Sequence, residues 1–305
     1  MTELRLDLKS LGVRIGHTTD REGGSGCSVF LFDRPVRASV SVRGAAPASR
    51  ETDLLMPGKL IREIHGIVLS GGSAFGLESA YGVMKYLEER GIGYDTGTAV
   101  VPIVPAAAIY DLKYGKDVRP GKDWGYKAAQ NADYILESGI VGASAGATVG
   151  KFLGIERASK TGLGIYEVQF DGYRLVAVMV VNALGEVVDE RGEIIAGVRS
   201  DRGFLPAMEL VKGLDFEKIR RGENTTLGVV VTDFPLNKEM LFRLAEVSHN
   251  GIVRAVRPSH TPFDGDIIFA VSTAEGAGEE NPYRLLKLFA FAEYAVQKAI
   301  LNSVV

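Results

Sequence analysis

The chain has 305 residues, 46% of them hydrophobic, which is enough for a substantial core. Its formal net charge is −3, so it has no strong basic field to attract nucleic acid or an anionic membrane surface. The single cysteine, Cys27, excludes a disulfide within the chain and a metal site built from several cysteines.

Short apolar runs rich in β-branched residues predict strands along most of the chain. In order, they cover residues 13–15, 28–32, 38–42, 67–69, 99–104, 165–170, 175–181, 227–231 and 267–271. The run at 38–42 alternates apolar and polar residues, which is typical of a strand with one face toward water.

Three helices have clear start or stop signals. The first follows Ser73 and has Gly91 beyond its end as a C-terminal cap. The second begins near Asn237, and the third begins at Asn281, an N-cap residue followed by proline, and runs to about Leu301. Many strands with few long helices suggest sheets covered by layers of helices.

The junction between Asn224 and Thr225 is the most informative point of the sequence. A polar segment changes there into an apolar run that reads as a buried strand, with Thr225 at its start. Attack of the Thr225 hydroxyl on the Asn224 carbonyl would break the chain and free an α-amine, which could then act as a general base. Strands that start with threonine are common, however, and Thr226 is an adjacent competitor, so the junction needs further support.

That support comes from six other segments that occur in the order of a known family: residues 43–55, 66–77, 101–112, 142–151, 180–185 and 261–266. Together with the junction they resemble the DmpA-type aminopeptidases of peptidase family S58. This group includes β-peptidyl aminopeptidases and is related to the nylon-oligomer hydrolases. The resemblance implies an α/β (α+β) fold, an αββα sandwich like that of the N-terminal-nucleophile hydrolases but with different strand connections.

The resemblance also implies one domain over residues 1–305 that cleaves itself into residues 1–224 and 225–305. The spacing from Thr225 to Asp233 matches the family and favours Thr225 over Thr226 as the nucleophile. An Asn-Thr junction is more like the nylon-oligomer hydrolases, because the aminopeptidases tend to carry Gly-Ser there.

Two side chains are expected to stabilise the oxyanion of the reaction. Asn182 ends an apolar run, and its amide can donate a hydrogen bond to a developing negative charge. By resemblance the Tyr110 phenol is a second donor. The ordinary alternatives are a turn asparagine before Gly185 and a half-buried aromatic at the end of a helix or strand.

Four more residues are catalytic candidates by resemblance. Asp264 and Asp266 could orient the Thr225 amine and hydroxyl, and Thr261 could stand in for the hydroxyl of the peptidase branch. Lys151 follows a glycine-rich loop, and a lysine near this position assists the nucleophile in the nylon-hydrolase branch. The alternatives are a turn at Asp-Gly and a solvated lysine.

The glycine-rich turn Ser70, Gly71, Gly72 and Ser73 links a strand to a helix and could seat an anion. The wider spacing of a dinucleotide-binding loop is absent. By resemblance these four residues line the substrate cleft.

Two other functions remain open. Residues 142–146 match Gly-x-Ser-x-Gly, which would make Ser144 a hydrolase nucleophile with His249 or His260 as its base. No convincing buried strand precedes Ser144, however. An uncleaved, non-catalytic member of the same fold that binds a small molecule is the other possibility.

The expected partner is a small peptide or amide substrate with a free amine. The four histidines His17, His65, His249 and His260 lack metal-ligand spacing and are more typical of structural positions, so no metal or cofactor is expected. The first residues lack the apolar region of a signal peptide and no apolar run reaches membrane length, so we expect a cytoplasmic protein without membrane or nucleic-acid contacts. The resemblance implies a homo-oligomer, a tetramer of αβ units.

Overall fold

Two β-sheets that share one long strand form the centre of the molecule. The computed structural model describes residues 4–213, 223–276, 278 and 281–305. The first sheet has the order β12 (Leu163–Phe170), β13 (Tyr173–Asn182), β18 (Thr225–Thr232), β20 (Ile267–Ser272) and the second half of β3 (Ser25–Val42). The second contains β2 (Val13–Asp20), the first half of β3, β5 (Glu63–Ser70), β8 (Ala106–Ala108) and β4 (Ala48–Arg50).

Strand β3 passes from one sheet to the other. Its residues 25–32 pair with β2, whereas its residues 37–42 pair with β20. The register with β5 shifts between Leu31 and Val36, and this irregularity lets the strand turn from one sheet into the other. The two sheets therefore face each other across a shared core.

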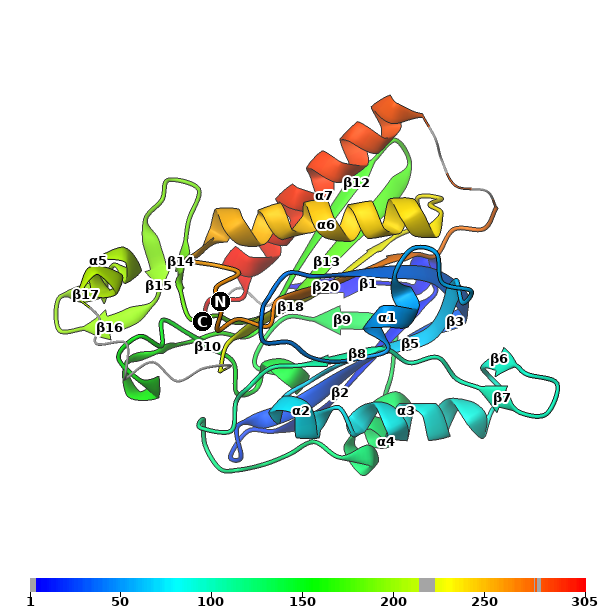
Figure 1. Cartoon of the computed structure of the whole chain (residues 1–305), viewed down its shortest axis with the longest axis horizontal. Coiled ribbons are helices and arrows are strands. Elements are labelled where there is room, and N and C mark those ends of the chain that lie inside the picture. Colours follow the sequence, from blue (N-terminus) through cyan, green and yellow to red (C-terminus); the bar gives the residue numbers. More distant parts are fainter. Residues whose placement is uncertain (1–3, 214–222, 277, 279–280) are drawn as a thin grey trace.

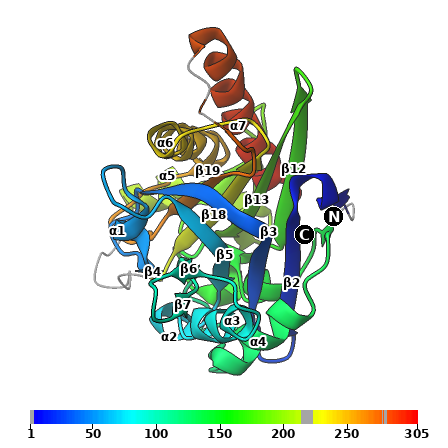
Figure 2. The same ribbon diagram turned by 90° about the vertical axis from the view of Figure 1, so that its right-hand side faces the viewer.

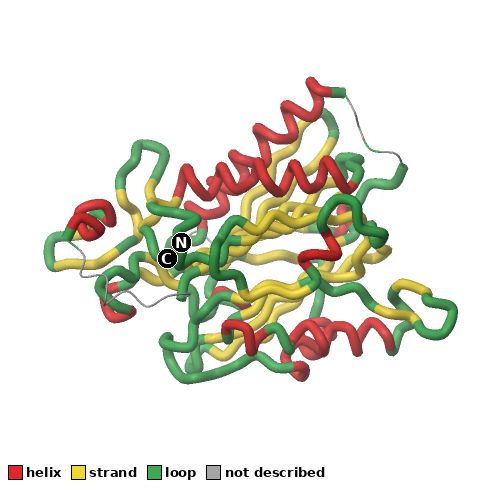
Figure 3. Tube along the Cα trace, viewed as in Figure 1, coloured by secondary structure: helices red, strands yellow, loops and turns green. Residues whose placement is uncertain are grey.

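Helices cover both outer faces of this pair of sheets (Figures 1 and 3). Helices α6 (Lys238–Ala255) and α7 (Pro282–Asn302) pack on the first sheet, and α3 (Ser79–Glu88) and α4 (Lys122–Gln130) pack on the second (Figure 2). Side chains such as Phe30, Val229 and Phe269 fill the space between the sheets. Two further apolar layers lie under the helix pairs, so the predicted αββα sandwich is confirmed.

Smaller elements surround the sandwich. Two-stranded pairs are β1 (Arg5–Asp7) with β9 (Ile135–Glu137), β6 (Tyr94–Asp95) with β7 (Val100–Val101), β10 (Thr148–Val149) with β11 (Ser159–Lys160), and β16 (Val198–Ser200) with β17 (Gly203–Leu205). Strand β14 (Glu186–Val188) lies between β15 (Ile194–Ala196) and β19 (Val256–Arg257). The short helices are α1 (Thr52–Leu55), α2 (Ser73–Gly76), α5 (Ala207–Lys212) and the 3-10 turns η1 (Lys9–Leu11), η2 (Gly142–Ser144) and η3 (Ile155–Arg157).

Most predicted elements are present, with three differences. The runs at 28–32 and 38–42 belong to the single strand β3, and the run at 99–104 is a strand only at Val100–Val101. The expected water-exposed face at 38–42 is wrong. Ser39 and Ser41 are buried, because α1 and α6 cover that face and bind its polar groups: Ser39 donates to the Leu55 carbonyl, and the Ser41 carbonyl bonds His249.

The start signals of the second and third helices are confirmed, whereas the single helix predicted after Ser73 is divided into α2 and α3. The side chains of Asn237 and Asn281 cap α6 and α7 by accepting backbone N–H bonds. Gly91 adopts a left-handed φ of 67° beyond the end of α3. None of the described helices is both long enough and apolar enough to cross a membrane.

Candidate active site

Sheet topology brings three distant segments to one end of the first sheet. Strand β13 runs antiparallel to β18, so its last residue, Asn182, lies opposite the first residue of β18, Thr225. Strand β20 runs parallel to β18, so the segment before it lies beside the segment before β18. A parallel bridge between Asn224 and Asp264 shows this contact directly. These three segments contain most of the residues that the sequence singles out.

The Asn224 carbonyl oxygen accepts two hydrogen bonds at the junction. The Thr225 hydroxyl donates to it over 2.5 Å, and the Gly265 N–H donates over 2.8 Å. Asn224 and Thr225 are only 2% and 3% exposed, so water hardly competes for these groups. A backbone N–H at this distance is the usual geometry of an oxyanion donor. The arrangement can therefore stabilise negative charge on this oxygen while a hydroxyl lies beside the same carbonyl.

Lys151 and Asn182 form the polar wall next to the junction. The Lys151 ammonium donates to the Asn182 side-chain oxygen over 2.7 Å and to the Glu223 carbonyl over 3.3 Å. The Asn182 NH₂ group donates to the Tyr110 carbonyl over 2.9 Å. Because Lys151 and the Thr148 N–H both donate to the Asn182 oxygen, this orientation of the amide follows from its partners.

Burial lowers the pKa of Lys151 to about 7, although Asp264, Glu223 and Asp111 oppose the shift with their negative charge. A lysine in this range can exist in either protonation state near neutral pH. It can therefore act as a cation beside the junction or as a proton carrier.

Tyr110 lines a cavity of about 130 Å³ next to the junction. Lys113, Lys151, Glu223 and Asn224 line the same cavity. The Tyr110 contact with Asn182 uses the backbone carbonyl, so the role expected of its phenol stays a prediction.

The two carboxylates before β20 have separate partners. Asp264 accepts from the N–H and the hydroxyl of Thr261, at 2.9 and 2.5 Å. Asp266 accepts from the Thr226 N–H over 2.6 Å. Burial, with the nearby charge of Asp266, raises the pKa of Asp264. Thr261 is thus a partner of Asp264, whereas Asp266 contacts the backbone next to Thr225.

His260 belongs to this cluster, although the sequence predicts for it a structural role or that of a base for Ser144. Its Nδ1 lies 2.7 Å from the second oxygen of Asp266, and its ring packs edge-on against His249 at 4.9 Å between centroids. Its backbone adopts a left-handed φ of 54°, which is uncommon for a residue other than glycine. His260 directly precedes the segment 261–266, which contains Asp266, and this short spacing is the signal that could have indicated the pair.

The turn Ser70, Gly71, Gly72 and Ser73 contacts the wall of the cavity at Asn224 through Asp111. The Gly72 N–H donates to Asp111 over 2.7 Å, and the other Asp111 oxygen accepts from Ser25 over 2.9 Å. Asp111 lines the cavity at Asn224, but none of the four turn residues does. Burial raises the pKa of Asp111 to about 6. The turn therefore supports the cavity wall, and its direct contact with substrate stays a prediction.

Ser144 has the contacts of a structural residue. Its hydroxyl is fully buried and lies 2.8 Å from the Val141 carbonyl and 3.1 Å from the Gly139 carbonyl. His249 and His260 bond the Ser41 carbonyl and Asp266 instead. The serine-hydrolase constellation suggested by Gly-x-Ser-x-Gly is therefore not assembled.

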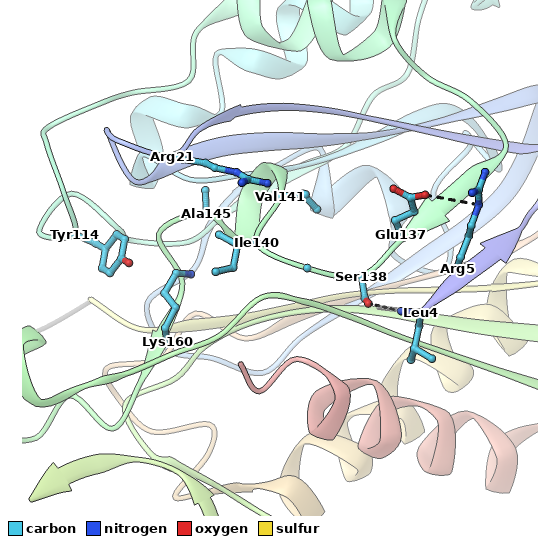
Figure 4. A pocket seen from close by; sticks show the side chains of 11 residues that line it. Leu4, Arg5, Arg21, Tyr114, Glu137, Ser138, Ile140, Val141, Ala145 and Lys160 are labelled. Atoms are coloured by element: carbon cyan, nitrogen blue, oxygen red, sulfur yellow. Dashed lines mark hydrogen bonds and ion pairs between the residues drawn. The ribbon is translucent and has the colours of Figure 1, made fainter. Parts of the chain in front are cut away.

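A larger cavity of about 690 Å³ also borders Tyr114 (Figure 4). Tyr114 lines both cavities, and Arg21, Ile140 and Lys160 lie around the larger one. The Lys160 ammonium donates to the carbonyls of Ser144, Ala147 and Thr161. None of the predicted site residues lines this cavity. In the described part of the chain, no group of three or more histidine, cysteine, aspartate or glutamate side chains could hold a metal ion.

Comparison with known proteins identifies the family of the chain. The model of Peptidase family S58 matches residues 9–305. An uncharacterized aminopeptidase of Mycobacterium tuberculosis (strain ATCC 25618 / H37Rv) is 38% identical over 282 residues, covering 86% of this chain and 79% of that protein. A 6-aminohexanoate-oligomer endohydrolase of Kocuria sp. (strain KY2) is 32% identical over 281 residues, covering 89% of this chain and 75% of that protein.

Solved structures show the same fold. The L-aminopeptidase D-Ala-esterase/amidase of Ochrobactrum anthropi, described as a variant of the Ntn hydrolase fold, superimposes with a TM-score of 0.71. It is 20% identical, and the match covers 95% of this chain and 83% of that chain. A Burkholderia sp. β-aminopeptidase also gives a TM-score of 0.71, at 18% identity and the same coverage.

Proposed function

The chain belongs to peptidase family S58, and from this premise we propose that it is a self-processing N-terminal-nucleophile amide hydrolase. It cleaves itself between Asn224 and Thr225, and the β chain that begins at Thr225 then hydrolyses small peptides or amides with a free amine. The observation that carries the proposal is the Asn224 carbonyl oxygen, which lies 2.5 Å from the Thr225 hydroxyl oxygen and 2.8 Å from the Gly265 nitrogen.

Self-cleavage begins with attack of the Thr225 hydroxyl oxygen on the Asn224 carbonyl carbon. The Gly265 N–H stabilises the oxyanion that forms. The bond between the Asn224 carbon and the Thr225 nitrogen breaks, and that nitrogen takes the hydroxyl proton. An ester now joins the two residues. Water hydrolyses it, leaving an Asn224 carboxylate and a free Thr225 amine.

The freed amine supplies the base for substrate hydrolysis. An α-amine has an ordinary pKa of about 7.7–8.0, which suits proton transfer near neutral pH. Asp266 holds the neighbouring Thr226 N–H and so fixes the backbone beside this amine. The Thr225 hydroxyl attacks the substrate carbonyl, the leaving amine takes the proton, and water then releases the acyl group.

The remaining site residues have supporting roles in this proposal. The Asn182 amide and the Tyr110 phenol stabilise the oxyanion of the substrate reaction. Lys151 supplies positive charge beside the junction, and Thr261 orients Asp264. A tetramer of αβ units and a cytoplasmic location are further proposals that rest on the family resemblance.

An amidase assay with two matched variants tests the proposal. Purified protein is incubated with amino-acyl p-nitroanilides and with a short 6-aminohexanoate oligomer. Hydrolysis should be lost in Thr225→Ala and kept in Ser144→Ala. Activity that survives Thr225→Ala and disappears in Ser144→Ala would instead assign the serine-hydrolase alternative. A processed chain that hydrolyses no amide would favour a binding protein.

A further inference from the structure

Glu223 and Asn224 occupy the place that the acyl part of a substrate must take in the proposed reaction. During self-cleavage, the group transferred to the Thr225 oxygen is the Asn224 carbonyl with the chain before it. During substrate hydrolysis, the same oxygen accepts the substrate's acyl group. Because the nucleophile is the same atom, the two acyl groups must approach it from the same region. The contacts of Glu223 therefore show what the acyl side of the site offers to a substrate.

Lys113 holds the Glu223 carboxylate in a two-point contact. Its ammonium nitrogen lies 2.6 and 2.5 Å from the two carboxylate oxygens. The side chains are 38% and 21% exposed, so the pair is partly shielded from water. Within the described residues, Glu223 is the only hydrogen-bond or ionic partner of Lys113.

Lys113 also lines the cavity of about 130 Å³ at the junction, together with Asn224. When the cut end that contains Glu223 withdraws, the ammonium group loses its partner while its own loop still borders the cavity. The other charged groups on this wall are already engaged: Asp111 by Gly72 and Ser25, and Lys151 by Asn182. Lys151 loses its 3.3 Å bond to the Glu223 carbonyl but keeps its bonds to Asn182, whereas Lys113 loses every partner that it has among the described residues.

We propose that Lys113 forms an acyl-side subsite for an anionic group, which selects substrates with a carboxylate one residue upstream of the scissile carbonyl. This inference rests on the proposed function. Before cleavage, Glu223 of the chain itself occupies this subsite. The preferred substrate should therefore resemble the sequence Glu-Asn that precedes Thr225. A partly exposed pair of this kind contributes up to about 1 kcal/mol, which corresponds to a preference of about fivefold.

Matched dipeptidyl p-nitroanilides measure this preference. The processed enzyme is assayed with Glu-Asn-, Gln-Asn- and Lys-Asn-p-nitroanilide, all of which carry a free amine. We expect kcat/KM to be about fivefold higher for the Glu than for the Gln substrate, and lowest for the Lys substrate. The ratio should shrink at high salt, because the charges are partly exposed to solvent.

Two substitutions of Lys113 and one control variant test whether this lysine causes the preference for the Glu substrate. Lys113→Met should bring the Glu-to-Gln ratio to about one, and Lys113→Glu should make the Lys substrate the better one. Lys116→Met is the control: that side chain is 72% exposed, pairs with Glu22 and lies outside the cavity lining. It should keep the wild-type ratio. Intact mass first confirms that each variant is cleaved.

The outcomes separate this inference from the proposed function. Equal kcat/KM for the Glu and Gln substrates, or a Glu preference that persists in Lys113→Met, would overturn the subsite. So would hydrolysis of simple amino-acyl anilides without hydrolysis of any of the three dipeptidyl substrates. If no amide at all is hydrolysed, the proposed function itself fails. If the Lys113 variants are not cleaved, the Glu-to-Gln ratio of kcat/KM in the wild-type enzyme still tests the subsite. A ratio of one, or a ratio that salt does not change, would overturn it.

Discussion

The carbonyl oxygen of Asn224 is held between a hydroxyl and a backbone N–H in a nearly water-free place. The hydroxyl belongs to the next residue, Thr225, and the N–H belongs to Gly265. The Gly265 bond belongs to the parallel bridge between Asn224 and Asp264, which continues the register of β18 with β20 up to the junction. The local geometry thus places a hydroxyl and a backbone hydrogen-bond donor at one peptide bond, as the proposed self-cleavage requires.

The contact between His260 and Asp266 predicts an effect of a single side chain on the rate of amide hydrolysis. His260→Leu removes the group 2.7 Å from Asp266, so the carboxylate beside the Thr226 N–H loses its alignment. We expect kcat for amide hydrolysis to fall about tenfold with little change in KM, since a hydrogen bond to a charged group contributes about 1.5–3 kcal/mol. Steady-state kinetics of the processed variants measure this change.

His260→Asn can keep a donor near the Nδ1 position and should recover much of the lost kcat. His65→Asn is the control, because this buried histidine bonds the Ile103 N–H far from the junction in the fold. An equal loss of kcat in His260→Leu and His65→Asn would show a general packing effect and contradict a positioning role.

The family resemblance, together with residue types and spacing, predicted Thr225, Asn182 and the acid pair as candidates, and the structure brings these residues to one edge of the sheet. The sequence missed Gly265, His260 and Lys113 for a physical reason. Gly265 acts through its backbone, which every residue type possesses. The Lys113 contact joins residues that are 110 positions apart, and no local pattern encodes that pairing.

At the scale of the elements, the antiparallel pair β13–β18 and the parallel pair β18–β20 fix the site. The end of β13 and the start of β18 meet at one edge, and the segment before β20 is brought there by its parallel partner. Hydrophobic runs predicted these strands well, but their pairing partners depend on long-range packing that periodicity does not contain. Because periodicity does not contain these long-range contacts, the sequence predicts two strands where the structure has the single strand β3.

Gly265→Ala tests how closely the turn before β20 must approach the junction. An added methyl group would lie 2.6 Å from the Ala46 carbonyl oxygen and 2.9 Å from the Thr225 hydroxyl oxygen. Both distances are below ordinary contact, so the turn must shift and its N–H must leave the Asn224 oxygen. We expect self-cleavage to slow at least tenfold while the fold is kept, since loss of one oxyanion donor costs about 10²–10³ in rate.

A time course of intact mass after purification measures this cleavage rate. Gly213→Ala is the matched control, because the nearest atom to its added methyl group, the Leu210 oxygen, is 4.0 Å away. Cleavage of Gly265→Ala at the wild-type rate would exclude the Gly265 N–H as the oxyanion donor.

For the molecule as a whole, burial of two lysines links stability to pH. Burial lowers the pKa of Lys151 and of Lys160 to about 7, from an ordinary value of 10.5. Between these values the unfolded chain binds more protons than the folded chain, so stability rises with pH in this window. Below about pH 7 the folded chain must hold both charges, and the destabilisation is complete.

We therefore expect the thermal midpoint of the uncleaved Thr225→Ala chain to rise between pH 7 and pH 9. Adding Lys160→Met should reduce this rise, because one of the two linked protons is removed. Adding Lys116→Met at the exposed position should leave it unchanged. Differential scanning calorimetry measures the midpoints. A rise of the same size in the chain with Lys160→Met would contradict the assignment of Lys160.

The layered architecture could be predicted from the sequence, whereas the cavities could not. Family resemblance predicted the αββα sandwich, and three apolar layers confirm it. The two cavities that Tyr114 lines are bordered by loops, residues 138–141 before η2 and residues 110–114 after β8, whose paths depend on contacts across the fold. Hydrophobic patterning describes buried strands and helices, and it carries little information about such loops.

Intact mass under denaturing conditions, with N-terminal sequencing of any fragment, is the measurement that tests self-cleavage most directly. Freshly purified protein should give two chains, residues 1–224 and 225–305, the second beginning Thr-Thr-Leu-Gly-Val. Thr225→Ala should remain a single full-length chain. A wild-type protein that keeps its full mass on long incubation, or a Thr225→Ala variant that is still cut at this bond, would contradict self-cleavage by Thr225.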